Sequence, residues 1–173
     1  MELYDLKGEL PIGKIGYHVI SRLFAGGNLI GGWSHARDLI YADTLFKAYN
    51  TEQKVYETLM LAEKAGINTI NIGFPSNPLL DKYKKMTGSK IKVISQVHPN
   101  LDNSKLSQIG SNTNKQLYFE NINKAIDFGV DIIQVQGNWC DWLVRDNKIE
   151  VIHEMIEHIR QQGYSAVFAA HSV

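Results

Sequence analysis

One unit recurs four times along the chain, and it constrains the fold more than any other feature. In each copy a helix-like stretch ends at a glycine, and a short apolar segment follows almost at once. The four glycines are Gly66, Gly88, Gly129 and Gly163. Glycine is favoured after a helix because it readily adopts the left-handed conformation that side chains disfavour. Helices that alternate with apolar strands predict an α/β protein with a parallel sheet built from βαβ units.

The pattern also gives the expected positions of the elements. Helices are expected at 51–66, 77–88, 114–129 and 147–163, and strands at 67–72, 91–97, 131–136 and 164–170. A fifth strand is expected at 21–27, after a small hairpin that contains Gly13 and Gly16. In the last helix the apolar spacing predicts one buried face, made of Ile149, Ile152, Ile156 and Ile159.

Five parallel strands suit two architectures. One is a partial (β/α)8 barrel, and the other is an open doubly wound sheet; a complete barrel needs about 250 residues, whereas this chain has 173. The strand-to-helix connections are long, at roughly 27–50, 98–114 and 137–146, and we expect loops there. They follow the carboxyl ends of the strands, where parallel α/β proteins bind their ligands.

Four segments carry a resemblance to a known family. The segment "LPIGKIGYHVISRLFAGGNLIGGW" resembles the glycine-containing hairpin and first barrel strand of the aldo/keto reductases. "AEKAGINTINIG" resembles that family's first helix and second strand, and "KVISQV" and "GVDIIQVQGNW" fall at its third and fourth strands. The resemblance implies that residues 1–173 form a single domain, the N-terminal part of a (β/α)8 barrel that is truncated after its fifth strand.

The catalytic tetrad of that family is not preserved. Its members use Asp, Tyr, Lys and His, and the corresponding positions here are Asn71, the vicinity of Ser76, Gln96, and Asn138 or Trp139. The family contacts the NADP phosphate mostly after strands seven and eight, outside this chain. The resemblance therefore implies an oxidoreductase-like barrel whose usual mechanism is replaced, and we do not expect this chain to bind NADP tightly. The sequence does not identify another cofactor.

Polar side chains stand where the expected strands end. The candidate catalytic residues are Asn71, Gln96, His98 and His171. Amides hydrogen-bond the hydroxyl and carbonyl oxygens of sugars and polyols, and two imidazoles could begin a divalent-metal site at His98 and His171. The alternative is that each histidine is a solitary residue bonded to the backbone.

The candidate substrate-binding residues lie in two of the long connections. They are Trp33, His35 and Arg37 after the first strand, and Gln136, Asn138, Trp139 and Asp141 after the fourth. An arginine can hold a carboxylate or phosphate, and a tryptophan can stack on a sugar face. The alternative for the first loop is an ion pair of Asp38 with Arg37 or His35 that holds the loop together.

Composition narrows the class of function. The 18 basic and 18 acidic residues balance, so no nucleic-acid surface is indicated, and the single cysteine excludes an intrachain disulfide. No apolar run reaches the roughly 18 residues of a membrane span, and we expect a cytoplasmic protein. Open strand edges predict self-association.

The residues at the strand ends favour one function and leave two others open. The favoured one is binding of a small polar, carbohydrate-like ligand at the carboxyl rim. One alternative is a metal-assisted isomerase, lyase or hydrolase that acts on a sugar derivative through His98 and His171. The other is a non-enzymatic binding module.

Overall fold

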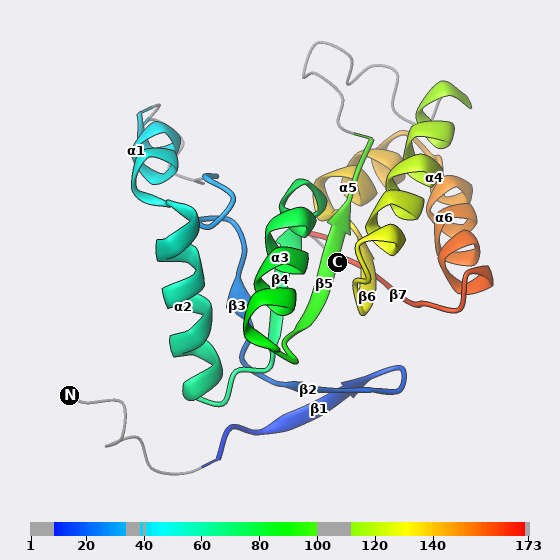
Figure 1. Ribbon diagram of the computed structural model, residues 1–173. Helices are drawn as coiled ribbons and strands as arrows, with labels where there is room; N and C mark the ends of the chain where they lie inside the picture. Colours follow the sequence, from blue (N-terminus) through cyan, green and yellow to red (C-terminus); the bar gives the residue numbers. More distant parts are fainter. Residues whose placement is uncertain (1–8, 34–38, 40, 100–111, 172–173) are drawn as a thin grey trace. The chain divides into compact units, whose positions relative to one another are not determined.

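The structure is a computed structural model, and it describes residues 9–33, 39, 41–99 and 112–171 (Figure 1). The chain separates into two compact units, residues 1–93 and 94–173. The elements of the first unit are β1 (Ile12–Ile15), β2 (His18–Ser21), β3 (Ala25–Gly26), α1 (Ala42–Tyr49), α2 (Glu52–Lys64), β4 (Thr69–Gly73), a 3-10 helix (Phe74–Ser76) and α3 (Asn77–Thr87). Strand β5 (Lys92–Val97) begins before the boundary, and the second unit continues with α4 (Asn112–Asp127), β6 (Ile132–Val135), α5 (Gly137–Arg145), α6 (Ile149–Gln161) and β7 (Ser165–Phe168).

The parallel strands form one five-stranded sheet in the order β3-β4-β5-β6-β7, which confirms the expected α/β class. The order follows the chain and never reverses. A doubly wound sheet reverses its strand order at one point, whereas a barrel does not. The strand order is therefore consistent with a partial barrel, and the sheet of the described residues is open.

The four glycines of the repeated unit all have positive φ, as the sequence predicts. The angles are 88° at Gly66, 71° at Gly88, 64° at Gly129 and 83° at Gly163. Each value lies in the left-handed region, where glycine carries no steric penalty. Because this conformation ends the preceding helix, the strand can begin within a few residues, and the expected helices and strands are found close to their predicted positions.

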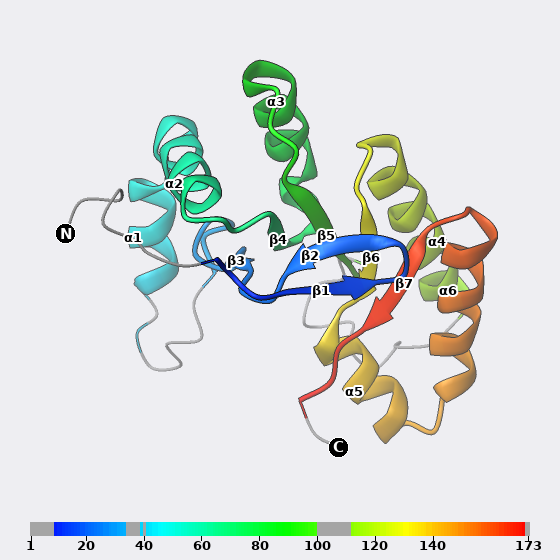
Figure 2. The same ribbon diagram turned by 90° about the horizontal axis from the view of Figure 1, so that it is seen from below.

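The first unit begins with the expected hairpin, in which β1 and β2 are antiparallel (Figure 2). Ser21 ties it to the start of β4: its backbone N–H donates to Asn68 Oδ1 at 2.6 Å, and its Oγ accepts from the Asn68 N–H at 3.1 Å. The strand expected at 21–27 is shorter than predicted, because β3 contains only Ala25 and Gly26.

Two connections that the sequence predicts as loops contain helices. Helix α1 lies within 27–50, and α5 occupies most of 137–146. The reason is clear for α5, because Trp139, Cys140 and Leu143 recur at helical spacing and are all buried. This apolar stripe is hidden in the sequence, because it starts directly after a strand and is interrupted by Asp141 and Trp142.

Helix α6 is present as expected, but its buried face differs from the predicted one. Val151, Met155 and Ile159 are buried, whereas Ile149 is 57% exposed. Ile152 and Ile156 are half-buried. The helix carries two apolar stripes. It contacts β6 and β7, and only the stripe of Val151, Met155 and Ile159 is fully buried. Spacing alone does not select between two stripes on one helix.

Strand β6 is the centre of the second unit. It pairs in parallel with β5 and with β7, and its Ile132, Ile133 and Val135 are completely buried. Burial on both faces is typical of a central parallel strand. None of the helices in the described part of the chain is long and apolar enough to cross a membrane.

Candidate functional site

The carboxyl end of β6 passes into α5 almost without a loop. β6 ends at Val135, Gln136 occupies the N-cap position of α5, and the helix starts at Gly137. The backbone N–H of Gln136 donates to the carbonyl of Val97 at 3.2 Å, which holds it beside the end of β5. This short connection places Asn138, Trp139 and Asp141 at the carboxyl ends of the strands of the second unit.

Asp141 and His171 form a hydrogen-bonded pair. His171 Nδ1 lies 2.6 Å from Asp141 Oδ2, and the backbone N–H of His171 donates to Asp141 Oδ1 at 3.1 Å. These two contacts lower the pKa of the Asp141 carboxyl below its usual value, the side-chain contact more than the backbone one. The carboxylate is therefore ionised at neutral pH and holds the imidazole in one orientation.

His171 presents the other side of its ring to solvent. Its side chain is 61% exposed, whereas that of Asp141 is 26% exposed. Within the described residues no hydrogen bond to Nε2 is found. A carboxylate on Nδ1 and an accessible Nε2 is an arrangement that permits proton transfer.

Gly137 makes room for this imidazole. A Cβ atom at Gly137 would lie 2.9 Å from Cε1 and 3.3 Å from Nδ1 of His171. Such approaches are closer than ordinary van der Waals contact, so the ring rests directly on the backbone at the start of α5. The absence of a side chain at Gly137 therefore allows His171 to lie against the backbone between β6 and α5, where it meets Asp141.

His98 follows β5 and has a different environment. Its ring is parallel to that of Trp139, with an angle of 3° and 6.4 Å between the centroids. The Asn121 side chain donates to the His98 carbonyl at 2.7 Å. Burial lowers the pKa of the His98 imidazole to about 4, so this histidine is neutral at pH 7.

Trp139 belongs to an aromatic cluster. It is 4% exposed. Its ring is edge-on to that of Tyr118, with 5.8 Å between the centroids, and nearly edge-on to that of Trp142, with 5.2 Å between the centroids. These distances lie in the range in which aromatic pairs attract each other. In this structure Trp139 presents no face to solvent, and it supports the end of β5 from within the core.

Cys140 is buried as well, at 2% exposure, and its thiol contacts the carbonyl of Val135 at 3.8 Å. Burial raises the pKa of this thiol to about 12. Since the thiolate is the reactive form, Cys140 does not serve as a nucleophile at neutral pH.

The remaining candidates of the second unit lie at or near the carboxyl ends of β5 and β6. Gln96 is the last residue but one of β5, and it pairs in register with Gln134 of β6. Asn138 is exposed on α5, and Gln136 is half-buried. Sequence reasoning missed Gln134, whose Oε1 is buried without a hydrogen-bond partner in the described part of the chain, and it missed Gly137. The "QGN" directly after the strand was the available signal for Gly137.

The first unit contains the candidates Asn71 and Trp33, together with His35 and Arg37. Asn71 lies in the middle of β4 rather than at its end, and it pairs in register with Gly26. A Cβ at Gly27 would lie 2.5 Å from the carbonyl oxygen of Asn71, so the backbone closes over this position. Trp33 is 63% exposed, with Lys47 Nζ 5.3 Å above its ring. His35 and Arg37 lie outside the described residues.

The metal site predicted at His98 and His171 stays a prediction. The described residues contain no group of three or more His, Cys, Asp and Glu side chains that could hold a metal ion. The geometry instead gives each histidine its own neighbour, Trp139 for His98 and Asp141 for His171.

Comparison with solved structures supports the resemblance at the level of the backbone. The chain is similar to a crystal structure from Pseudomonas aeruginosa that is provisionally described as an aldo-keto reductase, with a TM-score of 0.58 and 18% identity. The similarity covers 97% of this chain and 61% of that one. No protein-family model matches the sequence, and a search of curated proteins finds no match. At this level of identity the similarity concerns the fold.

Proposed function

We propose that this chain binds a small ligand with hydroxyl or carbonyl oxygens at the carboxyl ends of β6 and β7, and that His171 exchanges a proton with it. The observation that carries the proposal is the Asp141–His171 pair, with Nδ1 and Oδ2 2.6 Å apart. The carboxylate selects the tautomer that has its proton on Nδ1. Nε2 then carries the lone pair that can accept a proton from the ligand.

In this proposal Asp141 is a positioning residue and His171 is the catalytic base. Asp141 also stabilises the imidazolium that forms when Nε2 takes the proton, because its carboxylate remains ionised. The first backbone N–H groups of α5, beginning at Gly137, have no partner within the helix and can donate to a ligand oxygen. Gln136 and Asn138 supply amides at the same helix end, which suits a polyhydroxylated, carbohydrate-like molecule.

The fold supports the proposed position of the ligand site, whereas the proposed reaction rests on the residues at that site. Parallel α/β proteins bind ligands at the carboxyl ends of their strands. The similar Pseudomonas structure suggests carbonyl or hydroxyl chemistry, but amides occupy the positions of the reductase aspartate and lysine, at Asn71 and Gln96. We therefore propose proton transfer rather than hydride transfer by the residues of this chain.

Proton exchange on a simple ketose tests the catalytic part. Dihydroxyacetone is incubated with the protein in D₂O, and NMR follows exchange at the carbon next to the carbonyl. His171 would take the carbon-bound proton, leaving an enediolate, and solvent deuterium would replace that proton on return. We expect catalysed exchange that falls at least about 100-fold in His171→Gln, in the range typical of general-base catalysis. Asp146→Asn is the matched control, because Asp146 pairs with Arg145 at the far end of the same helix.

Two outcomes would separate the alternatives. Exchange that is equally fast in His171→Gln would contradict the proton-transfer proposal. A shift of the His171 Cε1–H resonance with ribose, but no exchange, would favour the non-enzymatic binding module. Exchange that requires added Zn²⁺ and is lost in His98→Gln would favour the metal-assisted alternative.

A further inference from the structure

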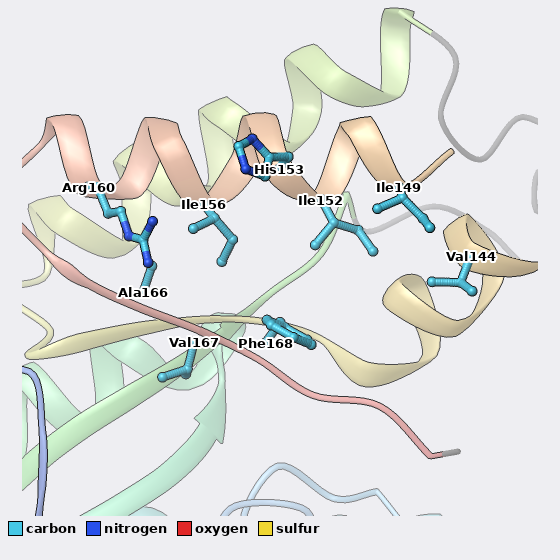
Figure 3. Close-up of a pocket in the computed structure, with 9 residues that line it drawn as sticks. All are labelled: Val144, Ile149, Ile152, His153, Ile156, Arg160, Ala166, Val167 and Phe168. Atoms are coloured by element: carbon cyan, nitrogen blue, oxygen red, sulfur yellow. The ribbon is translucent and has the colours of Figure 1, made fainter. Parts of the chain in front are cut away.

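One face of the sheet in the second unit carries two neighbouring amide side chains. In β7, Ala166 points toward α6 and Val167 points away from it (Figure 3). Val167 is the register partner of Gln134 in β6, and Gln134 is the register partner of Gln96 in β5. Partners in neighbouring parallel strands lie on the same face of a sheet. Gln96, Gln134 and Val167 therefore share the face that α6 does not cover.

The packing of the sheet does not account for Gln134. Its Oε1 is buried and, within the described part of the chain, has no hydrogen-bond partner. Such acceptors are rare, because an unsatisfied buried oxygen has lost its hydrogen bonds to water without replacement. The preceding residue on the same face, Ile132, is completely buried, so this face of the strand accepts apolar side chains. A bound ligand that offers a hydroxyl group would supply the missing partner.

The amide of Gln134 suits a hydroxyl group in particular. The residue as a whole is half-buried, so part of the side chain is accessible although Oε1 is not. A glutamine has a carbonyl acceptor and an NH₂ donor, and rotation about its last side-chain bond exchanges their positions. A hydroxyl group both donates and accepts. Gln134 can therefore bind a ligand hydroxyl in either orientation of the amide.

Gln134 lies deeper along the strand than the imidazole of His171. The next residue on the same face is Gln136, which occupies the N-cap position of α5. One strand repeat of two residues, about 6.6 Å, separates the two glutamines. His171 lies against the backbone at Gly137, beyond Gln136. A ligand that contacts both His171 and Gln134 must therefore extend along the sheet by more than the length of a very small molecule.

We propose that Gln134 binds a hydroxyl group at the far end of the ligand, and that the site accepts keto sugars of five or six carbons in preference to trioses. This inference rests on the proposed function and assigns a substrate class to the same site. A three-carbon ketose with its carbonyl group at His171 is too short to reach Gln134, whereas an open five-carbon chain spans the distance. Gln134 contacts the ligand away from the reacting carbon, so it contributes to specificity.

Proton exchange in D₂O tests the specificity. Ribulose, a five-carbon ketose, is compared with dihydroxyacetone in the wild-type protein and in Gln134→Met, which keeps the length of the side chain and removes its amide. We expect the wild-type kcat/KM to be at least about tenfold higher for ribulose. Gln134→Met should lose most of this preference through a higher KM for ribulose, as expected for one lost hydrogen bond in binding. Gln161→Met is the matched control, because Gln161 is exposed at the end of α6.

A titration separates this inference from the proton-transfer proposal. NMR follows the side-chain NH₂ resonances of Gln134 with xylitol, a five-carbon polyol, and with glycerol. Neither molecule has a carbonyl group that can react. We expect a saturable shift with xylitol and a much weaker one with glycerol. The measurement does not require proton transfer by His171, so it tests Gln134 even where no exchange is catalysed.

Two results would overturn the inference. One is the same ratio of kcat/KM for the two ketoses in wild type and in Gln134→Met. A melting temperature that also falls by more than about 5 °C in this variant would assign the amide to packing. The other is a Gln134 resonance that xylitol leaves unchanged. If dihydroxyacetone exchange is not catalysed at all, the proposed function fails, and the titration alone decides the inference.

Discussion

The carboxyl ends of β5 and β7 each carry a histidine, and the two differ in almost every physical respect. His98 is half-buried, parallel to the Trp139 ring, and neutral, with its pKa lowered to about 4. His171 is exposed, rests on Gly137 and is held by an ionised Asp141. In the sequence the two residues look equivalent, because each follows a short apolar strand.

The difference teaches that a histidine after a strand is defined by what packs against it. At the end of β5, α4 contributes Asn121, which binds the His98 carbonyl, and α5 contributes Trp139, which stacks on the imidazole; burial of the ring favours its neutral form. At the end of β7 the Asp141 carboxylate contacts Nδ1, and the described part of the chain shows no hydrogen bond to Nε2. Only the second arrangement combines access with a fixed orientation, so the two histidines should respond differently to every perturbation below.

The largest effect is expected from Trp139→Ala. Removing a buried tryptophan should lower the free energy of unfolding by about 3–5 kcal/mol. The pKa of His98 should rise toward its usual value as water reaches the ring, whereas the Asp141–His171 contact should persist. Urea denaturation and histidine NMR titration measure the two effects. Trp33→Ala is the control, because Trp33 is 63% exposed, and equal destabilisation by both variants would contradict the assigned burial.

A second prediction concerns pH. The pKa of His98 is lower in the folded state, about 4, than its ordinary value of 6.5, so the unfolded chain binds the proton more readily. The associated stability is present above about pH 6.5 and is lost as pH falls to about 4, by up to about 3 kcal/mol. Urea denaturation at several pH values measures it, and His98→Gln should remove this slope. Any loss linked to Asp141 should come at lower pH, as pH falls through its lowered pKa. A slope unchanged in His98→Gln would show that another group titrates.

Gly137→Ala should disturb the His171 pair and leave His98 unchanged, and it should change the free energy of unfolding less than Trp139→Ala does. The added methyl would displace His171 from Asp141, and the pKa of the Asp141 carboxyl should rise toward its usual value, as carboxyl carbon NMR can measure. The free energy of unfolding should change by only about 1 kcal/mol, since alanine is favoured over glycine in a helix by a similar amount. Gly26→Ala is the control, because a Cβ there meets no atom within 4 Å. A normal Asp141–His171 contact in Gly137→Ala would disprove the role of the glycine.

The smallest effect is expected from NADPH. Amides replace the charged tetrad positions at Asn71 and Gln96, so the cofactor should shift the resonances of neither histidine and show no saturable fluorescence change. Low-micromolar binding by residues 1–173 would contradict this expectation and would restore hydride transfer as the leading proposal.

The sequence by itself determined the alternation of helices and strands. Each of the four glycines of the repeated unit ends a helix by adopting a positive φ, and this conformational requirement is local to the residue. The parallel sheet follows from the same alternation, and the candidate His171 and Asp141 follow from their positions after expected strands. The cap of α2 is also local, because Thr51 Oγ1 accepts from the Lys54 N–H at 3.3 Å.

Only the tertiary structure decided which surfaces these elements use. Asp141 and His171 lie 30 residues apart, and nothing in either segment states that they meet. The burial of His98 depends on a tryptophan from another helix, and the choice between the two stripes of α6 depends on the sheet beneath it. Pairing and desolvation arise from non-local contacts, whereas helix ends and strand starts arise from the conformational limits of a few neighbouring residues.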